Sequence, residues 1–273
     1  MKSRLWIGEL ILAAVVISLL FPVLLLFLTS FKPEGEILHY RSALPENWTL
    51  DNYHRLLSRP EEAPVWRWFF NSLLVAGGVT VLVLSVASMA AFALARLRPA
   101  GGGWLFAVIV ATTMVPAQVL LVPMYLILNA LGWIDSYAAL WIPAGANSFA
   151  VFLLYQFFRG IPRELDEAAA IDGCSPLGIY FRIILPLAKP ALATLAIFTF
   201  IGTWNDFVGP LIYLDSNDRL TMPVGIALFQ TSYYNDYGIT LAASVLCTLP
   251  VLILFFFFQK ALVRGIAMSG IKE

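Results

Sequence analysis

The chain has 273 residues, of which 60% are hydrophobic and 12% charged, and its 17 basic and 17 acidic side chains give no net charge. A soluble domain carries roughly 25% charged residues, so most of this chain lacks a surface suited to water and we expect an integral membrane protein. No block of Lys and Arg suggests a nucleic-acid partner. Cys174 and Cys247 have neither CxxC nor metal-site spacing and indicate no disulfide framework.

Six apolar runs are long enough to cross a bilayer, whose core of about 30 Å needs about 20 helical residues. The sequence predicts spans at 8–29, 69–95, 104–127, 137–158, 191–213 and 240–262. The first run follows Lys2 and Arg4 but is longer than the apolar part of a signal peptide, and no A-x-A site follows it. We therefore expect a retained anchor and a single all-α transmembrane domain of six helices over residues 1–273.

The basic residues predict how the spans are oriented. With the N-terminus in the cytoplasm, the two short outside loops carry only Arg219, whereas the inside segments carry many Lys and Arg. The inside residues are Lys2, Arg4, Arg96, Arg98, Arg159, Arg163, Arg182, Lys189, Lys260, Arg264 and Lys272. Because cytoplasmic segments are enriched in Lys and Arg, we expect both termini to be cytoplasmic.

The loop of about residues 30–68 is then extracytoplasmic. Its five basic residues are accompanied by six acidic ones, so it weakens the orientation argument without reversing it. Four prolines also interrupt it, which excludes one continuous helix. We expect it to pack as a small cap outside the membrane. His39 and His54 lie in it without an HExxH pattern, and we expect loop packing there and no metal site.

The segment of about residues 159–190, between the fourth and fifth spans, is unusually polar for this half of the chain. We place Pro162 at the first position of a short helix, acidic residues in its early turns, and Gly173 at its exit. A second, amphipathic helix is expected to begin with Ser175 as N-cap and Pro176 at its first position. It would lead into the fifth span at Pro190.

The apolar stripe of this second helix has helical spacing and consists of Leu177, Phe181, Ile184, Leu185 and Ala188. The first helix presents a run of alanines that lets another surface approach closely, with Glu167 and Asp172 beside it. These features suit a docking helix, but they equally suit an ordinary helix lying on the membrane surface.

Residues 167–190, EAAAIDGCSPLGIYFRIILPLAKP, closely resemble the EAA loop of the inner-membrane permease subunits of binding-protein-dependent ABC importers. The resemblance implies a cytoplasmic coupling loop that contacts an ATPase subunit, here through Glu167, Ala168, Ala169, Asp172 and Gly173. Cys174 stands where the family more often has Ala, which exchanges one small residue for another.

The similarity extends along the chain, through SFKPEGEI, LPENWTLDNY, NSLLVA, TWNDFVGPL and RGIAMSGIKE. These segments look like the carbohydrate-uptake branch, and specifically the smaller six-span permease of the maltose type. The resemblance implies a second permease subunit, two cytoplasmic ATPase subunits and an extracytoplasmic solute-binding protein, in a bacterial or archaeal cytoplasmic (inner) membrane. The SGIKE ending departs slightly from the family's tail, and no role is carried over to it.

The chain contains no GxxxxGK[ST] phosphate loop and no GxSxG elbow. We therefore expect no catalysis and no bound cofactor in this chain, and we expect ATP and Mg to be used by partner ATPase subunits.

Polar residues at membrane depth are costly and therefore informative. Trp204, Asn205 and Asp206 lie in the fifth predicted span, Asn147 in the fourth, and Gln118 in the third. An aromatic face beside amide and carboxylate oxygens would suit a sugar, so all five are candidates for a substrate pathway. They are equally suited to hydrogen bonds between helices or with the partner permease.

The sequence thus favours a permease subunit of an ATP-driven importer for a sugar or oligosaccharide. A glycerol phosphodiester or a polyol remains an alternative cargo. An ion-coupled secondary carrier and a membrane-embedded enzyme are the competing classes. The carrier would have more spans or inverted repeats, and the enzyme would have a nucleophile, a metal or paired acids within the spans.

Overall fold

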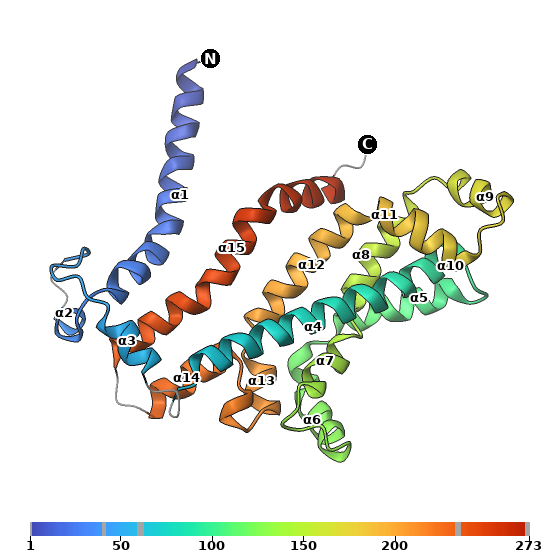
Figure 1. Cartoon of the computed structure of the whole chain (residues 1–273). Helices are drawn as coiled ribbons and strands as arrows, with labels where there is room; N and C mark the ends of the chain where they lie inside the picture. Colours follow the sequence, from blue (N-terminus) through green and yellow to red (C-terminus); the bar gives the residue numbers. More distant parts are fainter. Residues whose placement is uncertain (1, 40–41, 59–62, 233–235, 271–273) are drawn as a thin grey trace. The chain divides into compact units, whose positions relative to one another are not determined.

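The structure is a computed structural model that describes residues 2–39, 42–58, 63–232 and 236–270 (Figure 1). Within these residues all regular structure is helical. Four helical segments are long and apolar enough to span a membrane, namely Gly8–Ser30, Val65–Leu97, Ala138–Arg159 and Tyr237–Gln259. Two bent helix pairs raise the number to six if each pair crosses once. The predicted all-α membrane fold is therefore confirmed.

The chain forms two compact units, residues 1–69 with 222–250 and residues 70–221 with 251–273, and each is described by itself. The first unit contains α1 (Lys2–Ser30), α2 (Glu34–Leu38), α3 (Asp51–Leu57), the start of α4 (Val65–Phe92), α14 (Met222–Ser232) and the start of α15 (Tyr237–Gly270). The side chains of residues 8–22 in α1 are all exposed, although most are apolar. Such a helix suits a lipid environment, as expected for the first span.

The loop after α1 is held by contacts between the SFKPEGEI segment, residues 30–37, and residues distant from it in sequence. Asn52 Nδ2 donates to the carbonyl oxygens of Ser30 and Lys32, at 2.8 Å each. The buried Lys32 ammonium donates to the Ser42 carbonyl at 2.6 Å. The Glu34 carboxylate accepts from the first backbone N–H groups of α15, those of Tyr237 at 3.1 Å and Gly238 at 2.8 Å, where the helix dipole favours an anion. The described part of this loop is therefore packed within the first unit.

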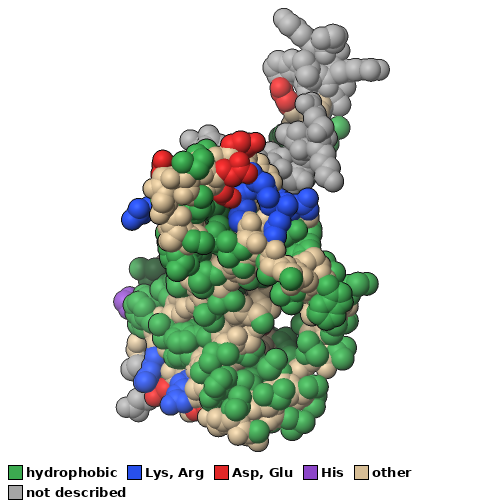
Figure 2. All heavy atoms as spheres, turned by 90° about the vertical axis from the view of Figure 1, so that its right-hand side faces the viewer, with side chains coloured by type: hydrophobic (Ala, Val, Ile, Leu, Met, Phe, Trp, Pro, Cys, Tyr) green, Lys and Arg blue, Asp and Glu red, His purple; other side chains and the backbone are tan. Residues whose placement is uncertain are grey.

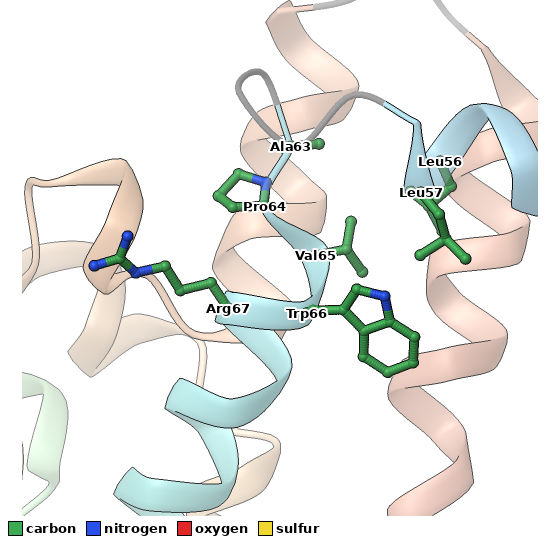
Figure 3. A pocket seen from close by; sticks show the side chains of 7 residues that line it. All are labelled: Leu56, Leu57, Ala63, Pro64, Val65, Trp66 and Arg67. Atoms are coloured by element: carbon green, nitrogen blue, oxygen red, sulfur yellow. The ribbon is translucent and has the colours of Figure 1, made fainter.

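A cavity of about 200 Å³ lies in the same unit, between the end of α3 and the start of α4. Leu56, Leu57, Ala63, Pro64, Val65, Trp66 and Arg67 line it. Figure 3 shows the Trp66 ring on the side of the leucines, while the Arg67 side chain points away from them. A sugar needs convergent polar groups, and this apolar lining does not supply them.

The second unit holds the remaining elements, which are the rest of α4, η1 (Ala93–Leu97), α5 (Gly102–Ala111), η2 (Thr112–Met114), η3 (Ala117–Leu120), α6 (Leu121–Ala130), α7 (Ala138–Ala144), α8 (Ser148–Arg159), α9 (Glu164–Ile171), α10 (Pro176–Ile179), η4 (Tyr180–Ile184), α11 (Leu185–Leu187), α12 (Lys189–Trp204), α13 (Val208–Tyr213), η5 (Asn217–Arg219) and the rest of α15. Of these, η1 and η4 are single π-helical turns.

The core of this unit is built on one face of α4. Its buried residues recur at every fourth position, at Val75, Val79, Val83, Ala87 and Ala91, which places them on one stripe of the helix. Small side chains in this stripe let neighbouring helices approach closely, as is usual in membrane bundles.

Three predicted spans are not continuous helices. The fourth, predicted at 137–158, is interrupted between Ala144 and Ser148. The third, predicted at 104–127, consists of Gly102–Met114 and Ala117–Ala130, which meet at 92°. The cause is local: Val115 precedes Pro116 and is extended, with ψ of 118°, because proline disfavours a helical residue before it. The fifth, predicted at 191–213, begins at Lys189 and stops at Trp204, and α13 starts only at Val208. A further bend of 76° separates Pro176–Leu187 from Lys189–Trp204.

Candidate functional site

The predicted coupling segment begins with α9, whose first turn contains Glu164, Asp166 and Glu167. Carboxylates there complement the unpaired N–H groups of a helix start. The helix begins two residues later than expected, because Pro162 lies outside it and Arg163 is its N-cap. The proline therefore fixes the approach of the chain to the helix and is not its first residue.

The exit of α9 is a left-handed glycine turn. Gly173 has φ of +81°. Its N–H donates to the Ala170 carbonyl at 3.0 Å, and the Cys174 N–H donates to the Ala169 carbonyl at 2.9 Å. This pair of bonds is the Schellman pattern, which satisfies the last carbonyls of a helix. Both the position of the turn and the need for glycine agree with the sequence prediction.

The next helix starts as predicted. Ser175 is the N-cap of α10, with its hydroxyl oxygen accepting from Gly178 N at 3.1 Å, and Pro176 occupies the first turn. The predicted apolar stripe, however, does not face one way. Ile184 and Ala188 are fully buried, but Leu177 and Phe181 are exposed. The π turn η4 is the reason, because a switch to i→i+5 hydrogen bonds shifts the residues that follow around the helix axis.

Most of the predicted coupling residues are exposed, on α9 or in the turn that follows it. Glu167, Ala168, Asp172 and Gly173 are exposed, and only Ala169 is buried. Figure 2 shows acidic side chains next to basic ones at the upper end of the face that it displays, above a broad hydrophobic surface. The alanines therefore do not bury a stripe against the chain itself, as those of a core helix would.

One large apolar side chain on this helix was not singled out from the sequence. Ile171, the last residue of α9, is 87% exposed. The sequence could have indicated its importance, because Ile171 lies three residues after Ala168 and four after Glu167. Residues at this spacing share a helix face.

A buried arginine holds the entry of α9. Arg96, in η1, is paired with Asp166, with 2.9 Å between Nε and Oδ2, and the two side chains are 3% and 21% exposed. Its Nη1 also donates to the Ile161 carbonyl at 2.9 Å, and its Nη2 to the Pro162 carbonyl at 3.2 Å. Sequence reasoning used Arg96 only to orient the spans. It missed this contact because the partners are 70 residues apart.

A groove of about 270 Å³ lies between η1, α9 and the start of α10. Its lining combines apolar and charged side chains of Phe92, Arg96, Leu97, Arg163, Asp166, Glu167, Ala170, Pro176 and Ile179. Directly after α10, Tyr180 of the turn η4 packs its ring on Phe92, with centroids 5.1 Å apart, and shares a 2.7 Å hydrogen bond with Ser88. The two π turns are thus joined through the end of α4.

The five predicted pathway residues lie at interruptions of the apolar helices. Gln118 is exposed in η3, just after the Pro116 break. Asn147 lies between α7 and α8 and is the N-cap of α8, with Oδ1 accepting from Ala150 N at 2.9 Å. A break in a membrane helix leaves backbone groups that protein or water must satisfy, and Asn147 satisfies one of them.

The other three residues lie at the end of α12. Trp204 is buried and stacks on Phe200, with ring centroids 6.0 Å apart. Asn205 is exposed and donates to the Ile201 carbonyl at 3.0 Å. The half-buried Asp206 accepts from Gly209 N at 3.3 Å and so holds the first turn of α13. Asp206 therefore has a structural task, and Asn205 is the exposed polar group of the trio.

Two contacts bring these interruptions near one another. The Thr112 hydroxyl and the Ser148 hydroxyl, at the breaks after α5 and before α8, are 2.6 Å apart. Helix α7 packs against α13, and Leu140 lies close to Gly209. Broken helices at membrane depth are tolerated where they line a cavity or are buried in protein, and this cluster of breaks is where the predicted pathway residues lie.

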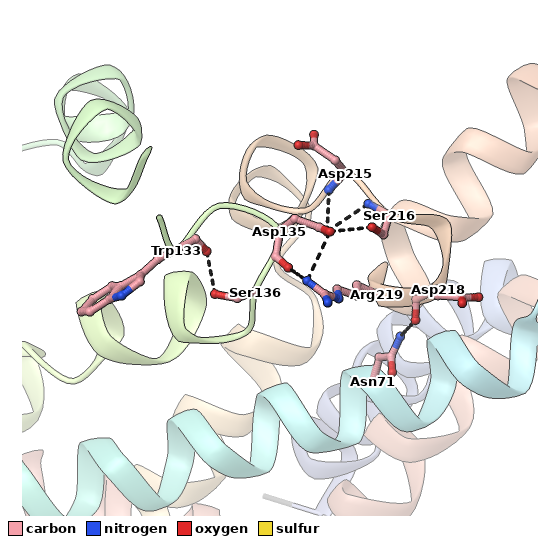
Figure 4. A network of polar contacts seen from close by, with 8 residues as sticks. All are labelled: Asn71, Trp133, Asp135, Ser136, Asp215, Ser216, Asp218 and Arg219. Carbon is pink, nitrogen blue, oxygen red and sulfur yellow. Dashed lines mark hydrogen bonds and ion pairs between the residues drawn. The ribbon is translucent and has the colours of Figure 1, made fainter. Parts of the chain in front are cut away.

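An acidic clamp joins the loop before α7 to the loop after α13 (Figure 4). Asp135 accepts from Asp215 N at 3.1 Å and from Ser216 N at 3.0 Å, and its carboxylate also pairs with Arg219 at 3.2 Å. Asp135 has φ of +57°, unusual for a residue with a side chain. Nearby, Asn71 Nδ2 of α4 donates to the carbonyls of Asp218 and Leu220, at 2.9 Å each.

Within the described residues, no group of three or more His, Cys, Asp or Glu side chains is placed to hold a metal ion. The end of the SGIKE tail, residues 271–273, lies outside the described part of the chain.

Comparisons with known proteins agree with the predicted resemblance. The family model described as "Binding-protein-dependent transport system inner membrane component" matches residues 84–268. The arabinooligosaccharides transport system permease protein AraQ of Halalkalibacterium halodurans is 37% identical over 98% of this chain and 96% of that protein. The trehalose/maltose transport system permease protein MalG of Thermococcus litoralis is 33% identical, covering 96% of each.

A solved structure has the same fold. It is a chain of a bacterial ABC transporter involved in the import of the acidic polysaccharide alginate, with a TM-score of 0.82. Sequence identity is 24%, and the match covers 95% of this chain and 97% of that one.

Proposed function

This chain belongs to the family of binding-protein-dependent transport system inner membrane components, and we propose that it forms half of the passage for a sugar or oligosaccharide in an ATP-driven importer. The cargo is inferred from relatives at 37% and 33% identity, whose names give arabinooligosaccharides and trehalose or maltose. The chain is a multi-pass membrane permease, and the other half of the passage would come from a second permease subunit.

The observation that carries the mechanism is the exposed helix α9 between two apolar segments. Its N-terminal residues are fixed by Arg96 and its exit by the Gly173 turn, while Glu167, Ala168 and Asp172 face outward. We assign Glu167, Ala168, Ala169, Asp172 and Gly173 to coupling with an ATPase subunit. The alanines permit close approach of a partner, and the two acids would meet basic groups on it. Ile171 adds an exposed apolar side chain, whose burial against a partner would be favourable.

The partner subunits and the orientation in the membrane follow from the assignment of α9 to ATPase coupling. Two cytoplasmic ATPase subunits would use ATP and Mg, and this chain would not hydrolyse ATP by itself. Both termini and α9 would be cytoplasmic, in agreement with the distribution of Lys and Arg. A solute-binding protein would deliver cargo at the opposite side, where the Asp135 clamp lies under this orientation.

For the passage we propose the breaks in the third, fourth and fifth spans. Gln118, Asn147, Trp204, Asn205 and Asp206 all lie there. Asn205 is the strongest candidate for contact with sugar hydroxyls because it is exposed and its oxygen is not used in the hydrogen bond to Ile201. Asp206 and Asn147 would shape the passage by holding the helices that begin after each break.

The function is tested by purifying the complex and measuring uptake of labelled oligosaccharide into vesicles. We expect uptake only with ATP inside, both ATPase subunits present, and binding protein outside. Uptake driven by an ion gradient without ATP would instead establish a secondary carrier. Screening the binding protein against sugars, polyols and glycerol phosphodiesters would identify the cargo.

The passage is tested by Asn205→Leu, which keeps the size of the side chain and removes its polar groups. We expect uptake to fall by about tenfold, as for the loss of a hydrogen bond to a bound polar ligand, with the amount of assembled complex unchanged. The control is Ser85→Ala, which removes an exposed hydroxyl that bonds only within α4. Normal uptake by a fully assembled Asn205→Leu complex would contradict the assignment.

A further inference from the structure

We infer that Arg96 is the positioning residue that transmits movement between α9 and the second span, α4. This inference rests on the proposed function, since it gives a route by which the coupling helix acts on the membrane helices. The structure shows a joint with three components: the side chain of Arg96, the chain entering α9, and the π turn η1 that carries the arginine.

The first step concerns how α9 is attached. It packs chiefly on α10, the helix that follows it. Of its residues after Asp166, only Ala169 is buried. Between α9 and the end of α4 lies the groove of about 270 Å³. The apolar packing that usually makes two helices move together is therefore sparse here, and the arginine supplies a direct link across the groove.

The second step concerns what Arg96 holds. Its guanidinium donates to two successive carbonyls, those of Ile161 and Pro162, and pairs with Asp166 in the first turn of α9. The planar guanidinium of arginine presents several N–H donors in a fixed arrangement and can therefore bind all three acceptors at once. The single ammonium of lysine cannot reproduce this geometry. Because the Arg96 side chain is 3% exposed, water competes little for these bonds. Displacement of α9 must therefore either carry η1 with it or break a buried charge pair.

The third step concerns what lies behind Arg96. The arginine is in one π turn, and Tyr180 of the other π turn is bound to Ser88 and Phe92 of α4. Single π turns inside helices are rare and occur often at functional sites. Both ends of the coupling segment thus attach to residues 88–96, at the end of α4 and in η1, the entry through Arg96 and the exit through Tyr180. A displacement of the coupling segment therefore acts on one helix, α4, which suits movement of that helix as a rigid body.

The test compares variants in the purified complex with its ATPase subunits and binding protein. Arg96→Met removes the charge and fork but keeps length and apolar volume. We expect the ATPase subunit to be retained, since the outward residues of α9 are unchanged. The ratio of ATP hydrolysis with loaded binding protein to hydrolysis without it should fall by about fivefold or more, the lower end of coupling between protein sites. Arg96→Lys should give an intermediate ratio.

The matched control is Arg98→Asn. Arg98 is exposed, is the C-cap of η1 and has φ of +49°, which asparagine tolerates, so this change removes the same charge two residues away from Arg96. We expect its ratio to equal that of the unmodified complex. Asp166→Asn should lower the ratio as Arg96→Met does, and the double variant should be no worse than Arg96→Met alone, because both changes break one interaction.

The outcomes separate this inference from the proposed function. If the unmodified complex neither retains an ATPase subunit nor responds to binding protein, the proposed function fails. If it does both and Arg96→Met has an unchanged ratio, the inference is wrong. Loss of the ATPase subunit from Arg96→Met and Arg96→Lys alike would also overturn it, since Arg96 would then only maintain the docking surface.

Discussion

Two ion pairs in the second unit hold loops in opposite ways. At α9 a buried cation, Arg96, donates to three acceptors on one incoming segment. In the acidic clamp a more exposed anion, Asp135, accepts from the loop 215–219, and it and Arg219 are 25% and 50% exposed. Removing one partner of a buried pair costs about 3–5 kcal/mol, whereas an exposed pair contributes about 0–1 kcal/mol.

This difference suggests different mechanical properties. The Arg96 joint should be stiff, because partial opening leaves a charge without solvent. The clamp should adjust easily, because water can replace each of its bonds in turn. Under the proposed function, a stiff joint would suit the side that meets the ATPase subunit and an adjustable clamp the side that meets the binding protein. Each region also contains a backbone with positive φ, at Gly173 and Asp135, so parallel substitutions can compare them.

The largest effect is expected for Gly173→Val. A Cβ at this position would meet no atom within 4 Å, but φ is +81°, so the penalty would come from the backbone and not from a clash within the chain. The left-handed conformation costs a residue with a Cβ about 1–2 kcal/mol, and more for a β-branched one. We expect stimulated ATP hydrolysis and uptake to fall by about tenfold or more. Gly173→Asn is the control, since asparagine tolerates this conformation. Equal loss in both variants would instead indicate that bulk at the contact matters.

A smaller effect is expected for Glu167→Lys. Reversing the charge on the outward side of α9 should weaken attachment of the ATPase subunit by about threefold to tenfold, in the range of an interfacial ion pair, with the joint itself intact. Glu164→Lys places the same charge in the same first turn and serves as control. Retention of the subunit in repeated washes at two salt concentrations is the measurement. If both lysines weaken retention equally, general electrostatics and not a specific contact is responsible.

The clamp should respond more mildly. Asp135→Ala removes the acceptor of two backbone N–H groups and should destabilise the two loops by about 1 kcal/mol. We expect protease to cut residues 214–221 about threefold to fivefold faster, with uptake reduced by less than in Glu167→Lys. Asp135→Asn keeps an acceptor oxygen and should give a smaller change. A cutting rate in Asp135→Ala equal to that of the unmodified chain would show that the clamp does not hold these loops.

The smallest effect is expected from pH. Burial raises the pKa of the Asp135 carboxyl, but hydrogen bonds from Ser216 and Asp215 and the charge of Arg219 outweigh it and hold the pKa below its ordinary value of 3.8. A lowered pKa in the folded state gives stability that is present above 3.8 and is lost as the pH falls through the lower folded value. We therefore expect no change in the corrected hydrogen exchange of the Asp215 and Ser216 amides between about pH 8 and pH 5. Loss of protection within that range would contradict the clamp geometry.

The sequence predicted the local features of the coupling segment well. Gly173, Ser175 and Pro176 have the conformations expected of them, because helix ends are decided by the few residues that supply a cap or a special φ. Apolar length likewise predicted the membrane spans, since a bilayer sets how many residues a helix needs. Family membership followed from a motif in which these local requirements are combined.

Other features depended on contacts between distant residues. The ion pair of Arg96 with Asp166 and the clamp of Asp135 with Arg219 join residues 70 and 84 positions apart, and no periodicity or local propensity specifies such partners. The π turn η4, which rotates Phe181 outward and Ile184 inward, is also invisible to a stripe drawn at 3.6 residues per turn. Composition, capping and proline thus determined which helices form and where the third span bends, whereas tertiary packing decided which faces the helices bury and which charges hold them.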